Sequence, residues 1–220
     1  MKTAFTLALL ATTASACIAG TPPSMAAQPA GTGVCCDKTA VASPADDCCQ
    51  TKLAATPFSK DSIYQLDGRF TDDSGRSFSL GSLRGRPVVL DMFFASCGYA
   101  CPLAVTDMLS VQQRLPSELR NRIAFVLVSF DIARDTPAAL AKYRAQRQLD
   151  GDWILLHGDE GSVRELAALL GVQYRKTADG AFTHSNQITV LNGEGEVIHV
   201  RKGLQGGLNE TVSALTQCSK

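Results

Sequence analysis

The sequence lacks a charge imbalance, a long apolar segment and any abundance of histidine. Lys plus Arg number 21, as do Asp plus Glu, and no basic run alternates with aromatic residues. That composition argues against nucleic-acid binding. No segment approaches the ~20 apolar residues that a membrane-spanning helix needs. The best candidate, PVVLDMFFA, is short and contains Asp91, so any membrane attachment is expected at the N-terminus.

Residues 1–16 have the layout of a secretory signal peptide, in which one Lys precedes an apolar stretch and small residues follow. Cleavage after residues 14–16, Ala-Ser-Ala, would be an ordinary A-x-A site. Small residues leading to Cys17 are also typical of a bacterial lipobox, so simple cleavage and lipidation both stay open. In either case we expect export, to the periplasm or to the outer face of the bacterial inner membrane.

Residues 17–57 are predicted to be a flexible tether, because Ala, Thr, Pro, Ser and Gly dominate them without a hydrophobic period. The stretch CCDKTAVASPADDCC carries two cysteine doublets, which comprise Cys35, Cys36, Cys48 and Cys49. These thiols could bind Cu(I) or zinc and pass copper to the folded domain. They could equally form disulfides between the doublets in an oxidising compartment, since adjacent cysteines do not readily bond to each other.

Residues 58–220 have the pattern of one folded domain. FTDDSGRSFSL predicts a hairpin that turns at residues 73–75, and PVVLDMFF predicts a buried strand. A helix is expected after CGYAC and should stop near Pro116. Another should begin at Thr136, with that residue as N-cap. Further elements are predicted at IAFVLVSF, WILLHG, SVRELAALLG, the hairpin from QITVLN to EVIHV, and the terminal helix LNETVSALTQ.

This order of elements predicts an α/β sandwich built on a mixed central sheet. Strand, helix, strand and helix are followed by a hairpin and a last helix. That is the thioredoxin arrangement, in which a strand leads directly into a helix whose N-terminus carries the cysteines. The expected fold class is a thioredoxin-like α/β sandwich with a disordered N-terminal tail.

Two cysteines, Cys97 and Cys101, stand four positions apart in FFASCGYACP. If both lie in the first helical turn, their side chains share one face about 5–6 Å apart. A helix N-terminus favours the thiolate, so two preorganised thiolates are expected. Three intervening residues, against the usual two of thioredoxin-type redox sites, favour a metal, although a disulfide is geometrically possible. Their place at a strand end argues against a purely stabilising disulfide.

Of the three histidines, His184 is the candidate for a third ligand. It lies in GAFTHSNQITV, a predicted polar loop before a strand, whereas His157 and His199 belong to predicted strands and are expected to pack or face solvent. Proline is absent after Pro137. Thioredoxin-like oxidoreductases place a cis-proline before that strand, where it keeps metals away from the cysteines, and this chain has His184 in that loop instead.

Three segments resemble the Sco/SenC family of copper-binding, thioredoxin-fold assembly factors for cytochrome c oxidase. CGYACP matches its Cys-x-x-x-Cys-Pro, VSFDIARDTPAALAKY is similar to its V-S-x-D-P-x-R-D-T-P segment, and HSNQITVLNGEGEV is similar to its His-bearing loop, strand and turn. The match covers roughly residues 60–205. Copper binds to the two cysteines and the histidine in that family, which implies Cys97, Cys101 and His184 here. Without the resemblance, a loop histidine is more often simply solvated.

The chain also departs from the family pattern. Gly98 replaces a frequent proline, Ile132-Ala133 replace the usual Pro-Glu, and the transmembrane anchor common in the family is not predicted. These departures affect the expected identity of the substrate and the partner more than the expectation of metal binding. Asp131 and Asp135 match acidic family positions, which implies a role beside the ligands, although such aspartates often serve as plain caps. Cys218 could be an exposed thiol or bridge to the tail.

The sequence therefore predicts an exported copper chaperone rather than an enzyme. Thiolates and imidazole suit Cu(I) and can take Cu(II) in an open geometry, whereas zinc prefers a fourth ligand or water. The expected client is a cuproprotein such as a cytochrome c oxidase subunit with its binuclear copper site, and a copper donor protein could load the chaperone. The alternative is a thiol–disulfide oxidoreductase in which Cys97 attacks and Cys101 resolves, and which could reduce the copper-site cysteines of a client. A peroxiredoxin-like peroxidase is a more distant third.

Overall fold

The computed structural model describes residues 56–218. The predicted signal peptide, most of the predicted tether and the candidate residues Cys17, Cys35, Cys36, Cys48 and Cys49 lie outside this range, so the predictions for them stay predictions. None of the described helices is both long and apolar enough to cross a membrane.

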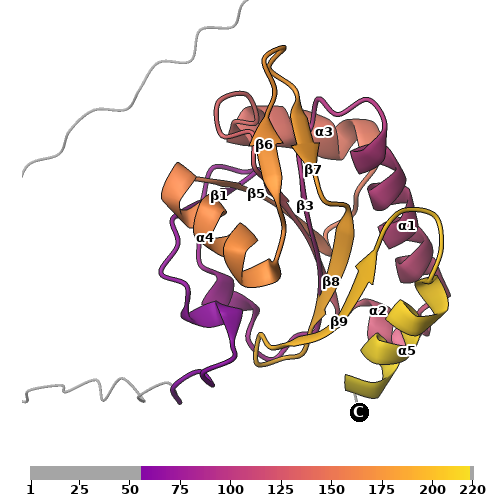
Figure 1. Ribbon diagram of the computed structural model, residues 1–220. Coiled ribbons are helices and arrows are strands. Elements are labelled where there is room, and N and C mark those ends of the chain that lie inside the picture. Colours follow the sequence, from indigo (N-terminus) through magenta and orange to yellow (C-terminus); the bar gives the residue numbers. More distant parts are fainter. Residues whose placement is uncertain (1–55, 219–220) are drawn as a thin grey trace, which may run out of the picture. The chain divides into compact units, whose positions relative to one another are not determined.

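A mixed seven-stranded sheet forms the centre of the fold, as predicted (Figure 1). Its strand order is β2-β1-β5-β4-β3-β8-β9. The bounds are β1 Phe70–Asp72, β2 Ser77–Phe78, β3 Val88–Phe93, β4 Ala124–Ser129, β5 Trp153–Gly158, β8 Gln187–Leu191 and β9 Val197–Lys202. Strands β3, β4 and β5 run parallel, and β8 joins β3 in the antiparallel sense. Every residue of β3 and β4 is buried, which is why both strands are nearly continuous apolar runs.

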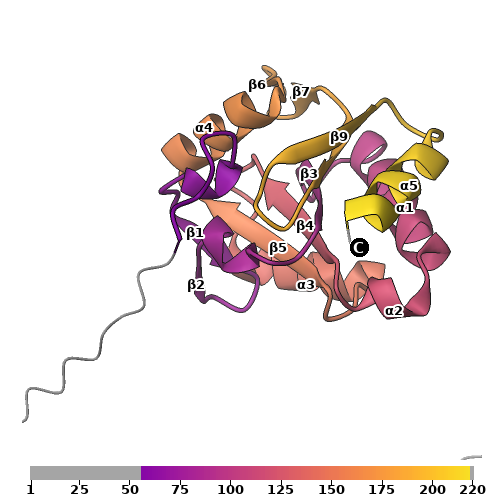
Figure 2. The ribbon, with the colours of Figure 1, turned by 90° about the horizontal axis from the view of Figure 1, so that it is seen from below.

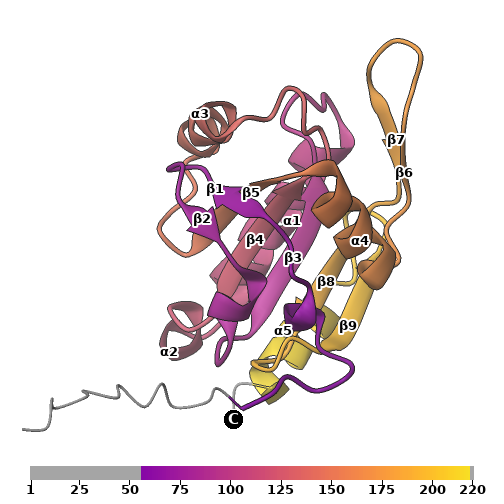
Figure 3. The same cartoon turned by 90° about the vertical axis from the view of Figure 1, so that its left-hand side faces the viewer.

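Helices cover both faces of this sheet (Figures 2 and 3). Helices α1 (Ala100–Arg114) and α3 (Pro137–Arg147) lie on one face with α5 (Leu208–Cys218), and α4 (Glu160–Leu170) lies on the other. Right-handed crossovers from β3 to β4 to β5 require α1 and α3 to share a face. Shorter pieces are α2 (Ser117–Arg120) and the 3₁₀ turns η1 (Ile63–Gln65) and η2 (Leu80–Leu83).

Local signals fix the helix ends. Thr136 caps α3 by accepting a hydrogen bond from the Ala139 N–H, as predicted for an N-cap threonine. Asp159 caps α4 in the same way, by accepting a hydrogen bond from the Ser162 N–H. The helix therefore begins at Glu160, before the predicted segment SVRELAALLG. Gly171 ends α4 with a φ of 70°, a left-handed conformation that glycine adopts without strain.

A small hairpin outside the main sheet was not predicted. Strands β6 (Tyr174–Lys176) and β7 (Phe182–His184) pair with each other alone. His184 therefore ends a strand and does not lie in a loop, which corrects the prediction. Three-residue strands that are mostly polar or half-exposed carry too little alternation for a sequence pattern to show. This hairpin brings His184 to the end of the sheet where β3 delivers the cysteines.

Candidate metal centre

The connection from β3 into α1 positions the two cysteines. Cys97 lies in the loop between these elements and is half-buried, whereas Cys101 is the second residue of α1 and only 2% exposed. The condition that both lie in the first helical turn is therefore not met, because Cys97 precedes α1, in agreement with the helix expected after CGYAC. The Cys97 sulfur instead accepts a hydrogen bond from the Cys101 backbone N–H at 3.4 Å, so it lies over the start of the helix. Both are free thiols.

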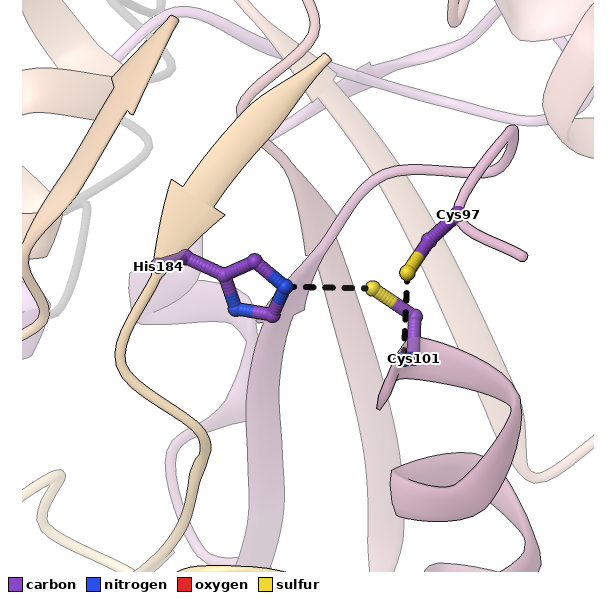
Figure 4. A group of neighbouring side chains, drawn as sticks. All are labelled: Cys97, Cys101 and His184. Atoms are coloured by element: carbon purple, nitrogen blue, oxygen red, sulfur yellow. Dashed lines mark hydrogen bonds between the residues drawn. The ribbon is translucent and has the colours of Figure 1, made fainter. Parts of the chain in front are cut away.

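His184 faces the cysteines from the end of β7 (Figure 4). Its Nε2 atom lies 3.7 Å from the Cys101 sulfur. The other ring nitrogen, Nδ1, lies 3.2 Å from the Ser185 carbonyl oxygen and donates its proton there. That bond selects the tautomer in which Nε2 has a free lone pair, the arrangement usual for metal-binding histidines.

The three side chains fit a single metal ion. One ligand atom from each of Cys97, Cys101 and His184 lies within 4.8 Å of the other two. First-row ions bind thiolate at about 2.3 Å and imidazole at about 2.0 Å, and with such bonds the 3.7 Å separation of sulfur and nitrogen corresponds to an angle near 120° at the metal. Two soft sulfurs and one nitrogen in a trigonal set favour Cu(I). The described residues form no other such group of His, Cys, Asp and Glu.

The two thiols differ in acidity. Burial raises the pKa of Cys97, but N–H groups at the start of α1, led by that of Cys101, outweigh it and leave the pKa below its ordinary value. Burial raises the pKa of Cys101, and the charge of Cys97 adds to that effect. The expected preference for the thiolate thus has support at Cys97, whereas burial opposes it at Cys101. In the absence of a metal, Cys101 holds its proton, because a metal or other cation is needed to compensate a buried thiolate.

Burial also lowers the pKa of His184, despite the opposing effect of its bond to Ser185. The ring is therefore neutral at physiological pH, as a metal ligand must be. Two aromatic rings contact the imidazole: the Phe94 centroid lies 5.9 Å from the imidazole centroid, and the Phe130 centroid lies 5.2 Å from it. Phe182 packs against both phenyl rings. Sequence analysis missed this aromatic layer, although Phe94 and Phe130 directly follow two strongly apolar strands.

The acidic candidates Asp131 and Asp135 are both buried. Asp135 accepts hydrogen bonds from the Ser129 hydroxyl at 2.6 Å and from the Ala95 backbone N–H at 2.8 Å. It thereby ties β4 to the loop that carries Cys97. The Asp131 carboxylate instead forms an ion pair with Arg134. Neither carboxylate belongs to the three-ligand group.

A further pair of buried titratable groups lies beneath α1. Asp91 points to the same sheet face as Phe93, because side chains alternate along a strand, and Phe93 contacts Tyr143 of α3 with ring centroids 5.2 Å apart. Burial raises the pKa of Asp91 to about 8 and that of Tyr143 to about 12. The charge of Asp91 also raises the pKa of Cys101. The sequence shows Asp91 as the one charged residue of an apolar strand.

The remaining candidates lie apart from the three ligands. His157 contacts the Asp135 carbonyl oxygen through Nδ1 at 3.0 Å, and His199 contacts the Thr211 hydroxyl through Nε2 at 3.2 Å. Cys218 ends α5, where its thiol donates to the Leu215 carbonyl oxygen. These contacts hold the two histidines in the protein framework, and neither belongs to the three-ligand group.

Fold and site together define a thioredoxin-like protein with a Cys-Cys-His group that could hold a metal ion. The family model SCO1/SenC matches residues 59–217, and the chain belongs to this family. A Stutzerimonas stutzeri protein whose name refers to copper binding is 28% identical over 148 residues, which are 65% of this chain and 71% of that protein.

Two solved structures show the same fold. Bradyrhizobium japonicum ScoI with copper bound has a TM-score of 0.56 and 20% identity, over 69% of this chain and 96% of that one. BsSco, described with a disulfide switch and as a member of the Sco family of cytochrome c oxidase assembly proteins, has a TM-score of 0.61 and 23% identity. That match covers 70% of this chain and 92% of BsSco. The expected thioredoxin-like fold and Sco/SenC family are thus confirmed.

Proposed function

We propose that this protein is a copper chaperone that binds copper through Cys97, Cys101 and His184 and delivers it to a copper protein. Copper is the cargo and not a resident cofactor. The observation that carries the proposal is the His184 geometry, with Nε2 aimed at the Cys101 sulfur and Nδ1 engaged by the Ser185 carbonyl. Membership in the SCO1/SenC family and the copper-bound ScoI relative support the choice of metal.

The client that we propose is the binuclear copper site of cytochrome c oxidase, in keeping with the assembly role described for BsSco. The chain would work outside the cytoplasm, in the periplasm or tethered to the outer face of the inner membrane through its N-terminal segment, with Cys17 as the candidate lipidation site. A copper donor protein would load it. The doublets Cys35-Cys36 and Cys48-Cys49 would serve as auxiliary copper ligands.

The geometry indicates how the cargo could leave. Cys101 is buried, whereas Cys97 and His184 are only partly buried, so an incoming client ligand approaches copper from the Cys97 and His184 side. Cys97 has the lower pKa of the two thiols and is the better leaving thiolate. Asp135 would hold the Cys97 loop in register through Ala95, which is the positioning role that we propose for it.

The first test removes the imidazole. His184→Ala should weaken Cu(I) affinity by more than the ~10–100-fold that changes around metal ligands cost, while the circular dichroism spectrum stays unchanged. His199→Ala removes a partly buried histidine outside the site and is the matched control. Competition with a chromophoric Cu(I) chelator measures both variants. Equal copper affinity in His184→Ala and the wild type would refute the copper site.

A second candidate function is thiol–disulfide exchange. The asymmetry of an accessible, more acidic Cys97 and a buried, less acidic Cys101 matches an attacking thiolate and a resolving thiol. For this function His184→Ala should leave the rate of disulfide reduction nearly unchanged and Cys97→Ser should abolish it. Wild-type reductase turnover in His184→Ala, together with weak copper binding by the wild type, would favour this candidate.

A further inference from the structure

A buried tyrosine hydroxyl of α3 has no hydrogen-bond partner. Tyr143 is 4% exposed, and together with Leu140 it forms the buried side of α3. Among the described residues, none forms a hydrogen bond with its hydroxyl oxygen. Burial of a hydroxyl without a partner costs free energy, and few buried polar groups in native proteins are left in that state. Packing alone does not account for this hydroxyl, because a phenylalanine would fill the same space.

Contacts with a core ring and with a surface cation hold the Tyr143 ring in place. The ring centroid lies 5.2 Å from that of Phe93, the last residue of β3. The guanidinium carbon of the exposed Arg147 lies 5.4 Å from the same ring centroid. The hydroxyl is therefore carried by a ring that is packed beside the end of β3.

The end of β3 also holds the buried metal ligand Cys101. Burial raises the pKa of this thiol, and a hydrogen bond from the backbone N–H of Phe94, the residue after Phe93, opposes that increase. Helices α1 and α3 lie on the same face of the sheet (Figures 2 and 3). Cys101, Phe93 and Tyr143 accordingly belong to one buried core. The hydroxyl and the Cys101 sulfur thus occupy the same layer, between the sheet and these two helices.

The charges that act on Tyr143 agree with this placement. Burial raises its pKa to about 12, against the opposing effect of Arg147. The charges of Cys101, Asp91 and Cys97 add to the increase, so both thiols lie within electrostatic range of the hydroxyl. A hydroxyl with so high a pKa keeps its proton at physiological pH and remains a hydrogen-bond donor.

Copper binding would create the acceptor that this donor lacks. A thiol is a weak hydrogen-bond acceptor, whereas a cysteine that binds a metal is a thiolate. The Cys101 sulfur would then carry negative charge at a place where only 2% of the residue is exposed, so water does not solvate it. One backbone N–H, that of Phe94, already donates to this sulfur. Hydrogen bonds to a charged acceptor are stronger than those to a neutral one, which makes a second donor favourable.

We propose that the Tyr143 hydroxyl is this second donor, and that on copper binding it turns its O–H toward the Cys101 thiolate and holds that sulfur in place. Tyr143 is then a positioning residue, which acts on copper through Cys101. The inference deepens the proposed function and rests on it, because it requires the Cys-Cys-His group to be a copper site. A hydrogen bond to the sulfur also favours Cu(I), because it reduces the electron density that the sulfur donates to the metal.

The first test removes the hydroxyl and keeps the ring. Tyr143→Phe should weaken Cu(I) affinity about tenfold, the lower range for groups that support metal ligands. Tyr64→Phe is the matched control, because Tyr64 is also buried with an unpartnered hydroxyl and its ring contacts Phe58 instead. Competition with a chromophoric Cu(I) chelator measures both variants. Wild-type affinity in Tyr143→Phe, or an equal loss in Tyr64→Phe, would overturn the inference.

The copper spectrum and reduction potential separate a hydrogen-bond donor from a group that only packs. Loss of a donor makes the thiolate a stronger ligand for Cu(II). In Tyr143→Phe the sulfur-to-copper charge-transfer band of the Cu(II) form should therefore shift to longer wavelength, and the Cu(II)/Cu(I) reduction potential should fall. Tyr64→Phe should change neither. An unchanged band and potential in Tyr143→Phe would overturn the inference even if the affinity falls.

Stability of the copper-free protein tests the premise that the hydroxyl is unpartnered. Because an unpaired buried hydroxyl is destabilising, the urea midpoint of unfolding should rise in Tyr143→Phe and also in Tyr64→Phe. Copper affinity and stability should thus change in opposite directions in Tyr143→Phe. A lower urea midpoint in that variant would show that the hydroxyl has a partner without copper, and would contradict a role reserved for Cys101.

A double variant distinguishes Cys101 from Asp91 as the acceptor. In an Asp91→Asn background, Tyr143→Phe should still lower Cu(I) affinity about tenfold, since effects without a shared partner add. If the loss disappears in that background, the hydroxyl acts on Asp91 and the assignment to Cys101 is wrong. Weak copper binding by the wild type would refute the copper site and this inference together. Tight binding that depends on His184 but not on the Tyr143 hydroxyl would refute this inference alone.

Discussion

The two halves of the candidate metal centre are built in different ways. Cys97 and Cys101 come from the junction of β3 with α1, where the strand is wholly buried and the helix packs on the sheet. His184 comes from a two-stranded hairpin outside that sheet, held by aromatic contacts with Phe94 and Phe130. The dithiol half is thus part of the core, whereas the histidine half depends on a few side-chain contacts. We expect local opening to be easier on the histidine side.

The largest effect is expected from removing a sulfur on the core side. Cys97→Ser and Cys101→Ser should each lower Cu(I) affinity by more than ~100-fold, because a hydroxyl is a poor ligand for a soft ion. Cys218→Ser changes a cysteine outside the site and should keep wild-type affinity. Chelator competition measures all three variants. Similar losses in the control would mean that tertiary damage, rather than ligand loss, weakens binding.

The next largest effect is the pH dependence of stability that is expected from Asp91, which lies beneath α1. Burial raises its folded-state pKa to about 8, above the ordinary value near 3.9, so the folded protein binds the proton more tightly than the unfolded chain. Its contribution to stability is therefore fully present below about pH 4 and is lost as pH rises toward 8, by up to ~1.4 kcal/mol per pH unit. The charge of Arg201 opposes this increase in the pKa of Asp91. The charge of Asp91 in turn raises the pKa of Cys101 and of Tyr143.

Asp91→Asn should flatten this pH dependence. Urea unfolding of the copper-free protein between pH 4 and 8 gives the free energy of unfolding at each pH. The variant should become more stable relative to wild type as pH rises. Glu118→Gln, at an exposed position, is the control. Parallel curves for Asp91→Asn and wild type would show that Asp91 keeps an ordinary pKa.

A smaller effect should follow from weakening the hairpin. Phe182→Ala removes a half-buried ring that contacts Phe94, Phe130 and Tyr174, and should cost about 1–2 kcal/mol, less than a fully buried phenylalanine. Copper affinity should fall about tenfold because His184 loses its support. Phe78→Ala, on the edge strand β2, is the control for loss of a ring away from the site. Unchanged affinity in Phe182→Ala would mean that the hairpin is held by other contacts.

The smallest effect is expected at Asp135. Asp135→Asn keeps the shape of the side chain, whose amide oxygen can still accept a hydrogen bond from the Ala95 N–H. The free energy of unfolding should therefore fall by only about 1 kcal/mol, because the hydrogen bonds become weaker when the acceptor is uncharged. Asp135→Ala leaves Ala95 and Ser129 without this acceptor and should cost more. Thermal unfolding ranks the three proteins, and copper affinity shows whether the Cys97 loop has moved. Equal stability in all three would remove the proposed positioning role.

Much of the fold could be predicted because its signals are local. Apolar runs of six residues, an N-cap threonine before a proline and a glycine after α4 each specify one element without help from the rest of the chain. The β6–β7 hairpin could not be predicted, since strands as short as Tyr174–Lys176 and Phe182–His184 are stabilised by Phe94 and Phe130, rings that directly follow β3 and β4. His184 was correctly singled out, but as a loop residue.

By itself, the sequence determined the order of the strands of the main sheet and of the principal helices, the place of the cysteines after β3, and the three residue types that suit a soft metal. Tertiary structure alone decided that Cys97 lies outside the helix, that its pKa falls while that of Cys101 rises, and that His184 turns Nε2 toward the sulfur. These properties depend on burial and on hydrogen-bond partners from distant segments. Spacing along a chain fixes which residues can be neighbours, whereas desolvation and orientation exist only once those segments have packed.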